Sequence, residues 1–295
     1  MKRYEIMLVA LVVMVGLLSG VSWLPLSWAQ PGSFSKDGYQ QSGNTYTWIR
    51  DLREDAAEVK SAEFRTINGF VDVKPQDPDA PNQVDVHAEI QLTRGLLGSE
   101  AKVLQVKESV DGVTTRGEDR LRVEAVQPKT LPWGVSVVVN LTVKVPKELP
   151  LDAVTVNGPV TVREVSAAVK LESVNGKVEA EACAGPLRAE TVNGSVRLVN
   201  TTSWVQAETV NGSVDIQMAG APDQDSSVET VNGSVRIATP PKTGLTLDFE
   251  NSNGGMHFEN ETFAGERQKH KVQGTIHGGG PVLRVRTVNG GITLE

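Results

Sequence analysis

Five glutamates are the residues best placed to do chemistry, because each lies three positions before an Asn-Gly or Asn-Gly-like corner of a repeated motif. They are Glu172, Glu190, Glu208, Glu229 and Glu250. If successive repeats stack in register, neighbouring carboxylates lie about 5–6 Å apart. Such a column is a candidate for a weak divalent-cation site or a surface for a basic partner, since like charges this close need compensation. Lys170 and Arg188 could neutralise part of it, and the alternative is a solvated strand face without a ligand.

A second charged column lies four residues after the asparagines. Its members are Glu179, Arg197, Asp215 and Arg236, and their sign alternates from one repeat to the next. Alternating charges are typical of cross-strand pairs that hold strands in register. We therefore predict a structural role for this column.

No catalytic, metal or cofactor site is predicted from the remaining reactive residues. The chain has four histidines, His87, His257, His270 and His277, and their spacing matches no zinc-binding motif. No arrangement of a nucleophile with a base can be recognised. The single cysteine, Cys183, excludes an internal disulfide. It lies among small residues in a predicted bend, which indicates a buried structural thiol.

The element that positions both columns is a corner built on Asn-Gly. The pairs are Asn157-Gly158, Asn175-Gly176, Asn193-Gly194, Asn211-Gly212, Asn232-Gly233, Asn253-Gly254 and Asn289-Gly290. Most of them follow one another at steps of 18 or 21 residues, and a degenerate copy at Val272-Gln273-Gly274 divides the last, longer step. A fixed period near 20 residues predicts a repeat architecture, here of eight turns from residue 151 to the C-terminus.

Apolar and polar residues alternate on both sides of each corner, the pattern of half-buried strands. Asn-Gly favours a tight turn because glycine adopts positive φ freely and asparagine tolerates it. Independent hairpins are the competing interpretation. The constant length of the repeats favours instead an all-β parallel solenoid, in which each residue stacks on its equivalent and Asn and Thr/Ser satisfy each other at the corner.

The N-terminal half is less regular. We expect a polar spacer over 30–60 containing a short strand at 46–49, an early copy of the corner at 64–73, strands at 84–90, 121–126 and 135–145, and a helix at 99–110 capped by Ser99. These residues predict a β-rich cap over 61–150 that is continuous with a solenoid over 151–295. A cap of this kind would cover the open end of the coils.

The first 29 residues have the pattern of an export signal. Lys2 and Arg3 precede an apolar run over 6–18, and Ser27-Trp28-Ala29 ends the segment with a small-x-small pattern. The alternative is an uncleaved membrane anchor, since apolar character continues to about Leu26. We expect a periplasmic, cell-surface or secreted protein. A net charge of -7 argues against nucleic acid as a partner.

The chain resembles the bacterial "putative adhesin" or toastrack family of β-strand-repeat proteins (domain of unknown function 4097). The resemblance rests on Thr66-Ile67-Asn68-Gly69, on Val145-Pro146 before the coils, and on the Val-Asn-Gly series over 155–290. It extends over about 60–295. It implies export or membrane attachment, in some members a part in envelope stress systems, and no catalytic residues.

Three hypotheses follow. The first is a non-enzymatic, exported solenoid that binds or scaffolds an envelope or surface component, protein or polysaccharide, and meets a membrane only through an uncleaved N-terminal segment. The second is a polysaccharide-acting parallel β-helix enzyme, although steps of 16 to 21 residues leave little room for loops that build a cleft. The third is end-to-end polymerisation, because residues 290–295 end in mid-strand without an obvious cap.

Overall fold

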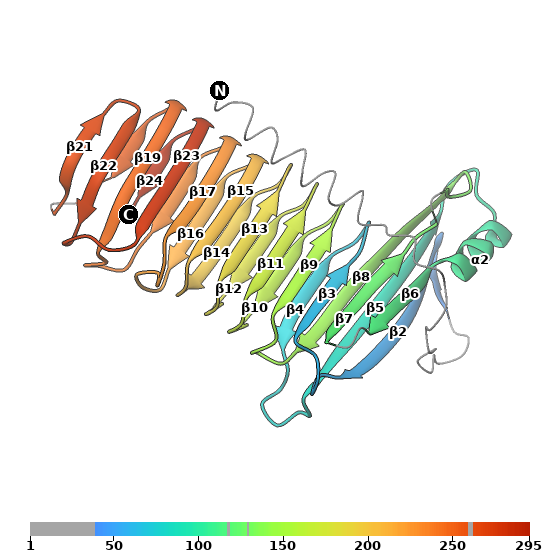
Figure 1. Cartoon of the computed structure of the whole chain (residues 1–295). Coiled ribbons are helices and arrows are strands. Elements are labelled where there is room, and N and C mark those ends of the chain that lie inside the picture. The colour runs from blue at the N-terminus through green and yellow to red at the C-terminus, as the bar shows by residue number, and fades with distance from the viewer. Residues whose placement is uncertain (1–38, 117–118, 129, 259–261) are drawn as a thin grey trace.

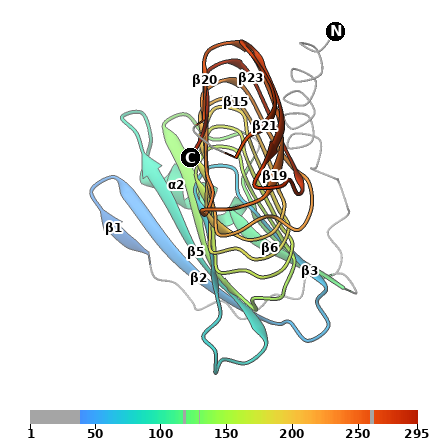
Figure 2. The same ribbon diagram turned by 90° about the vertical axis from the view of Figure 1, so that its left-hand side faces the viewer.

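Two twelve-stranded sheets form the molecule, as the computed structural model shows for residues 39–116, 119–128, 130–258 and 262–295. Each coil of the solenoid contributes one strand to each sheet, so the coils superimpose as flattened loops when the molecule is viewed from its end (Figure 2). The coils follow one another along the long axis (Figure 1). The predicted parallel β-solenoid is confirmed.

Sheet A contains, in spatial order, β1 (Gln40–Ser42), β2 (Thr45–Asp55), β5 (Gln83–Arg94), β8 (Val135–Val145), β4 (Val71–Pro75), β10 (Val160–Arg163), β12 (Val178–Glu181), β14 (Val196–Thr201), β16 (Val214–Met218), β18 (Val235–Ala238), β24 (Ile292–Leu294) and β20 (Met256–Phe258). Sheet B contains β21 (Ala264–Gln268), β22 (Lys271–Ile276), β19 (Leu245–Asn253), β23 (Val282–Asn289), β17 (Ser226–Asn232), β15 (Val205–Asn211), β13 (Leu187–Thr191), β11 (Val169–Ser173), β9 (Leu151–Thr155), β3 (Ser61–Arg65), β7 (Arg120–Val126) and β6 (Asp111–Arg116).

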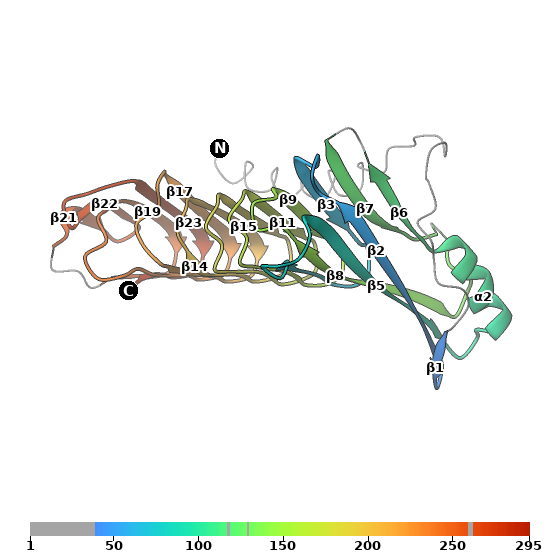
Figure 3. The ribbon, with the colours of Figure 1, turned by 90° about the horizontal axis from the view of Figure 1, so that it is seen from below.

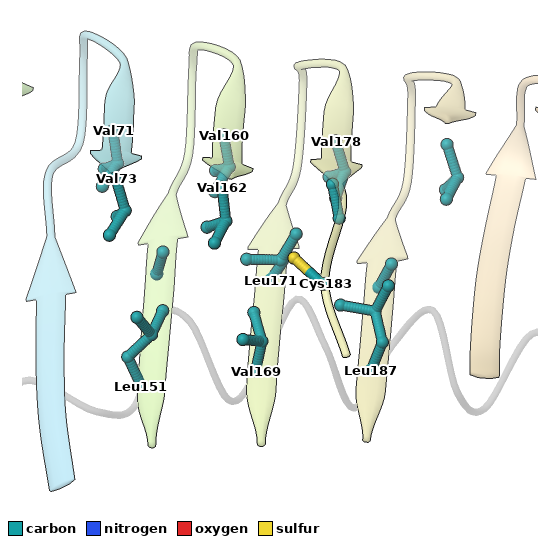
Figure 4. Close-up of a cluster of buried hydrophobic side chains, with 14 of the residues drawn as sticks. Val71, Val73, Leu151, Val160, Val162, Val169, Leu171, Val178, Cys183 and Leu187 are labelled. Carbon is teal, nitrogen blue, oxygen red and sulfur yellow. The ribbon is translucent and has the colours of Figure 1, made fainter. Parts of the chain in front are cut away.

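The core lies between the sheets and is built from the apolar positions of the alternation. In β11, for example, Val169 and Leu171 are buried, and they pair in register with Leu187 and Ala189 of β13. Aliphatic side chains of successive coils thus stack in columns along the axis (Figure 4). Because each coil can cover its apolar face only with its neighbours, the stacking itself stabilises the fold.

The last coil is out of sequence order. Strand β23 pairs in parallel with both β17 and β19, so it lies between two strands that precede it in the chain (Figure 1). Strand β24 is likewise enclosed by β18 and β20. The C-terminal strand is therefore an interior strand of sheet A, and the expectation that it forms an uncapped end is wrong.

The degenerate corner at residues 272–274 is also corrected. These residues lie in β22, which pairs antiparallel with both β19 and β21. They form one arm of a hairpin that closes the end of sheet B. Seven coils, and not eight, follow residue 151 within the described residues.

The N-terminal part extends both sheets beyond the coils. Strands β2, β5 and β8 pair antiparallel, and β8 then pairs in parallel with β4, so cap and coils share one sheet. The early corner forms as predicted, with β3 against β9. Helix α2 (Glu100–Ser109) is confirmed with Ser99 as its N-cap, and it lies at the end of the molecule beside β1 (Figure 3).

The expected polar spacer is wrong from residue 40 onward. Residues 40–42 and 45–55 are strands β1 and β2, and β2 is far longer than the predicted strand at 46–49. Tyr46 and Trp48 of β2 are buried in the core. Residues 1–29 and 30–38, the predicted signal and first part of the spacer, lie outside the described residues. The part of the chain that the structure describes contains no helix long and apolar enough to cross a membrane.

Candidate functional site

The asparagine side chains form a continuous ladder of amide hydrogen bonds along one edge of the solenoid. Each Nδ2 donates to the Oδ1 of the spatially preceding asparagine, at 2.7–2.9 Å: Asn157 to Asn68, Asn175 to Asn157, Asn193 to Asn175, Asn211 to Asn193, Asn232 to Asn211, Asn289 to Asn232 and Asn253 to Asn289. All amides point the same way. The asparagine side chains therefore satisfy one another's hydrogen-bonding groups from coil to coil.

The Thr/Ser residues of the motif bind the backbone, not the asparagines as expected from the sequence. Thr191 Oγ1 donates to the carbonyl oxygen of Gly176 at 2.9 Å, and Thr209 Oγ1 does the same to Gly194 at 2.9 Å. The corresponding pairs in other coils are Thr155 to Gly69, Ser173 to Gly158, Thr230 to Gly212 and Thr287 to Gly233. Each buried hydroxyl thus satisfies a carbonyl at the corner of the neighbouring coil.

Four of the five candidate glutamates form one unbroken column on the outer face of sheet B. Glu172, Glu190, Glu208 and Glu229 are direct partners in successive parallel strands. Glu250 is separated from them, because Arg286 of the inserted strand β23 lies between Glu229 and Glu250. The column therefore has four glutamates where the sequence predicted five, and the side chain after Glu229 is Arg286.

Basic and amide side chains compensate the column from within the same face. Lys170 Nζ lies 2.6 Å from Glu172, Gln206 Nε2 donates to Glu208 at 2.7 Å, and Arg286 lies 3.9 Å from both Glu229 and Glu250. The contacts follow the strand, from a residue to the glutamate two positions away, or cross to the next strand. Most of the like-charge repulsion predicted for the column is thus offset locally.

Glu190 differs from the other glutamates of the column because its side chain is buried. It pairs with Arg188 and is only 2% exposed, although it lies on the outward parity of the strand. Burial raises the pKa of Glu190, the Arg188 guanidinium opposes this, and the Glu172 and Glu208 carboxylates raise the pKa further. Its carboxylate is therefore a poor candidate for a ligand contact, and Glu208 and Glu229 are better placed.

Residues 151–295 match the Toastrack DUF4097 family over their whole length. This part of the chain belongs to the Toastrack family. The resemblance inferred from the sequence began near residue 60, whereas the match begins at β9. No curated protein matches the sequence.

Several solved structures are similar to the chain. They include a "putative cell adhesion protein" from Clostridium sporogenes (10% identity, TM-score 0.37, covering 84% of this chain and 98% of that one) and a "putative adhesin" from Bacteroides fragilis (11%, 0.41, 84% and 97%). A third is a "putative lipid binding protein" from Parabacteroides distasonis (11%, 0.39, 86% and 97%).

The alternating column of the Toastrack domain lies on the outer face of sheet A, where Glu179, Arg197, Asp215 and Arg236 are in register as predicted. No ion pair joins two of these four described side chains. Glu179 pairs with Lys177, which directly precedes its strand β12, and Arg236 lies 3.5 Å from Glu295. The predicted cross-strand pairing within the column is therefore wrong.

Cys183 points into the core of the Toastrack domain beside Leu171 (Figure 4). Its Sγ lies 3.6 Å from the carbonyl oxygen of Glu181, and burial raises the pKa of the thiol. Such a thiol is a poor nucleophile. Among the described residues, no group of three His, Cys, Asp or Glu side chains is arranged to hold a metal ion.

Proposed function

We propose that this chain is an exported, non-enzymatic module that binds or scaffolds a component of the cell envelope, in the periplasm, at the cell surface or after secretion. The supporting observation is the shortness of the connections between β9 and β19, of which the longest, 219–225, has seven residues. Loops that short cannot build a substrate cleft over a coil. They leave the two outer sheet faces as the extended surfaces of the module.

The outer face of sheet B is the proposed binding face. Glu208 and Glu229 are neighbours in register, and each is held by one side chain, Gln206 or Arg286, that a partner could displace. Acidic residues at this spacing suit a partner with repeated cationic groups, either a basic protein segment or an amino-bearing polysaccharide. Glu172 and Glu250 extend the face on either side.

The test is retention on fractionated envelope material. Both sheets, the helix and the core lie within residues 39–295, so a chain of residues 30–295 keeps the whole described fold. We expect it to be retained on one fraction of cell-wall polymer, polysaccharide or membrane protein. E208Q with E229Q should lower retention by roughly threefold to tenfold, since exposed charge pairs contribute little singly.

The matched control removes two charges from the opposite face, through E179Q with D215N. It should leave retention unchanged. Equal loss in both double variants would overturn the assignment of the face. Retention on no fraction would overturn the binding proposal altogether. Chemical breakdown of a polysaccharide fraction would show that the protein is an enzyme.

A further inference from the structure

Three large apolar side chains project into solvent at the end of the molecule that carries β1 and α2. Leu96 is 105% exposed, Leu97 72% and Trp133 82%, more than any other large apolar residue among those described. Leu96 and Leu97 lie in the loop from β5 to α2, and Trp133 lies in the loop from β7 to β8. We call these three residues the Leu-Trp tip.

Backbone contacts between glycines hold the two loops together. Gly95 N donates to the carbonyl oxygen of Gly134 at 2.7 Å. A Cβ on Gly98 would overlap that same oxygen, and a Cβ on Gly134, whose φ is +80°, would lie 2.8 Å from the carbonyl carbon of Leu97. The fold therefore brings the segment that carries the two leucines against the segment that carries the tryptophan, by a backbone contact that only glycine permits.

The chemistry of the two loops suits the interface of a lipid bilayer. The loop of residues 95–99 contains no charged residue and the loop of residues 127–134 contains one, Lys129, in a chain whose net charge is -7. Leucine and tryptophan are the side chains that insert at the boundary of headgroups and acyl chains. A projecting apolar tip can insert into a deformable partner or into a matching pocket. A bilayer is deformable at any point of its surface.

The path of the chain supports the same partner. Tyr39, the first described residue, lies beside the N-terminus of α2, with its hydroxyl 3.4 Å from Glu100. Helix α2 begins directly after the loop that carries Leu96 and Leu97. The apolar N-terminal segment ends near residue 26, and residues 27–38 can span at most roughly 40 Å. A chain that keeps this segment in a membrane would hold the tip within reach of the bilayer.

We propose that the Leu-Trp tip inserts into the interfacial region of a lipid bilayer. The long axis of the solenoid leads away from this end (Figure 3), so insertion would direct the coils away from the membrane. This contact goes beyond the proposed function and beyond any contact through the N-terminal segment. It uses neither sheet face, so either proposal can fail without the other.

Vesicle binding by the chain of residues 30–295 tests the proposal, because this chain lacks the apolar segment. We expect co-sedimentation with vesicles of phosphatidylethanolamine and phosphatidylglycerol, and a blue shift of tryptophan emission. The triple variant L96S, L97S and W133S should lower the bound fraction about tenfold or more. W133F should keep most of the binding while losing most of the emission shift.

The matched control is I67S, which removes a partly exposed isoleucine at the corner between β3 and β4. It should bind vesicles like the parent chain, and circular dichroism should show all variants folded. Absence of vesicle binding by the parent chain would overturn the proposal. So would equal binding by the triple variant, or self-association through the tip without vesicle binding, which would assign it to a second copy of the chain.

Discussion

Gly194 shows at the scale of one residue why the corners require glycine. A Cβ at this position would overlap the carbonyl oxygen of Gly176 in the neighbouring coil. We expect G194A to lower the free energy of unfolding by about 2–4 kcal/mol, because neighbouring coils must separate. Urea unfolding measures this. G220A, where a Cβ meets nothing within 4 Å, should change stability by less than about 0.5 kcal/mol. Equal effects would contradict the role of close approach.

Glu190 makes stability depend on pH in a direction opposite to that of most carboxylates. Burial raises the pKa of Glu190 in the folded state, with smaller contributions from Glu172 and Glu208. Between the unfolded and the folded pKa the folded chain therefore holds more protons, and stability falls as pH rises through that window. The whole penalty is present once the pH is above the folded pKa.

Replacement of this carboxylate by a neutral amide should therefore stabilise the protein. We expect E190Q to raise the free energy of unfolding at pH 7 by up to about 1 kcal/mol. The gain should vanish below the ordinary glutamate pKa of about 4.3. Thermal unfolding at pH 7 and pH 4 measures both, with E266Q on the exposed strand β21 as control. A destabilised E190Q at pH 7 would show that the pair with Arg188 outweighs burial.

At the scale of elements, Asp248 joins the inserted strand to the closing hairpin. From β19 it accepts hydrogen bonds from Gln273 of β22 at 3.0 Å and from Arg284 of β23 at 3.3 Å. Burial alone would raise the pKa of Asp248, but these two bonds and the Arg284 charge hold it below its ordinary value. The resulting stability is present above the ordinary aspartate pKa and is lost as pH falls through the folded pKa.

We expect D248N to lower the free energy of unfolding by about 0.5–1.5 kcal/mol at pH 7. The deficit should shrink as the pH is lowered through the folded pKa of Asp248, because the parent carboxylate then becomes protonated. Faster amide exchange confined to β22 and β23 would locate the effect. An unchanged exchange pattern would show that backbone pairing alone holds these strands.

At the scale of the whole molecule, the hairpin β21–β22 forms the end of sheet B, and we expect it to hinder end-to-end growth. Thr262 Oγ1 accepts a hydrogen bond from His277 N at 2.9 Å, so the ends of the hairpin segment lie close together. Replacing residues 263–276 by a short Gly-Ser linker would expose the edge of β19. We expect the parent chain of residues 30–295 to remain monomeric and the shortened chain to associate as concentration rises, measured by light scattering. Equal association by both would overturn the capping role.

The sequence alone determined the coil: the Asn-Gly period, the alternation of apolar residues and the register of equivalent positions are local properties, and they predicted the strands from β9 to β18. The order of the last coils needed the tertiary structure. Every Asn-Gly corner can hydrogen-bond to every other, so Asn289 can lie between Asn232 and Asn253 as readily as beyond Asn253. That insertion decides where Arg286 interrupts the glutamate column.

The same reason explains the other corrections. Strand β2 lacks the corner motif and is held by pairing with β5, about 40 residues away in the chain, so the sequence predicts only residues 46–49 of it as a strand and the rest as spacer. The Gly-Leu-Leu-Gly and Pro-Trp-Gly segments of the Leu-Trp tip are readable in the sequence. Their meeting is not, because the contact of Gly95 with Gly134 joins loops whose positions only the packed sheets and helix determine.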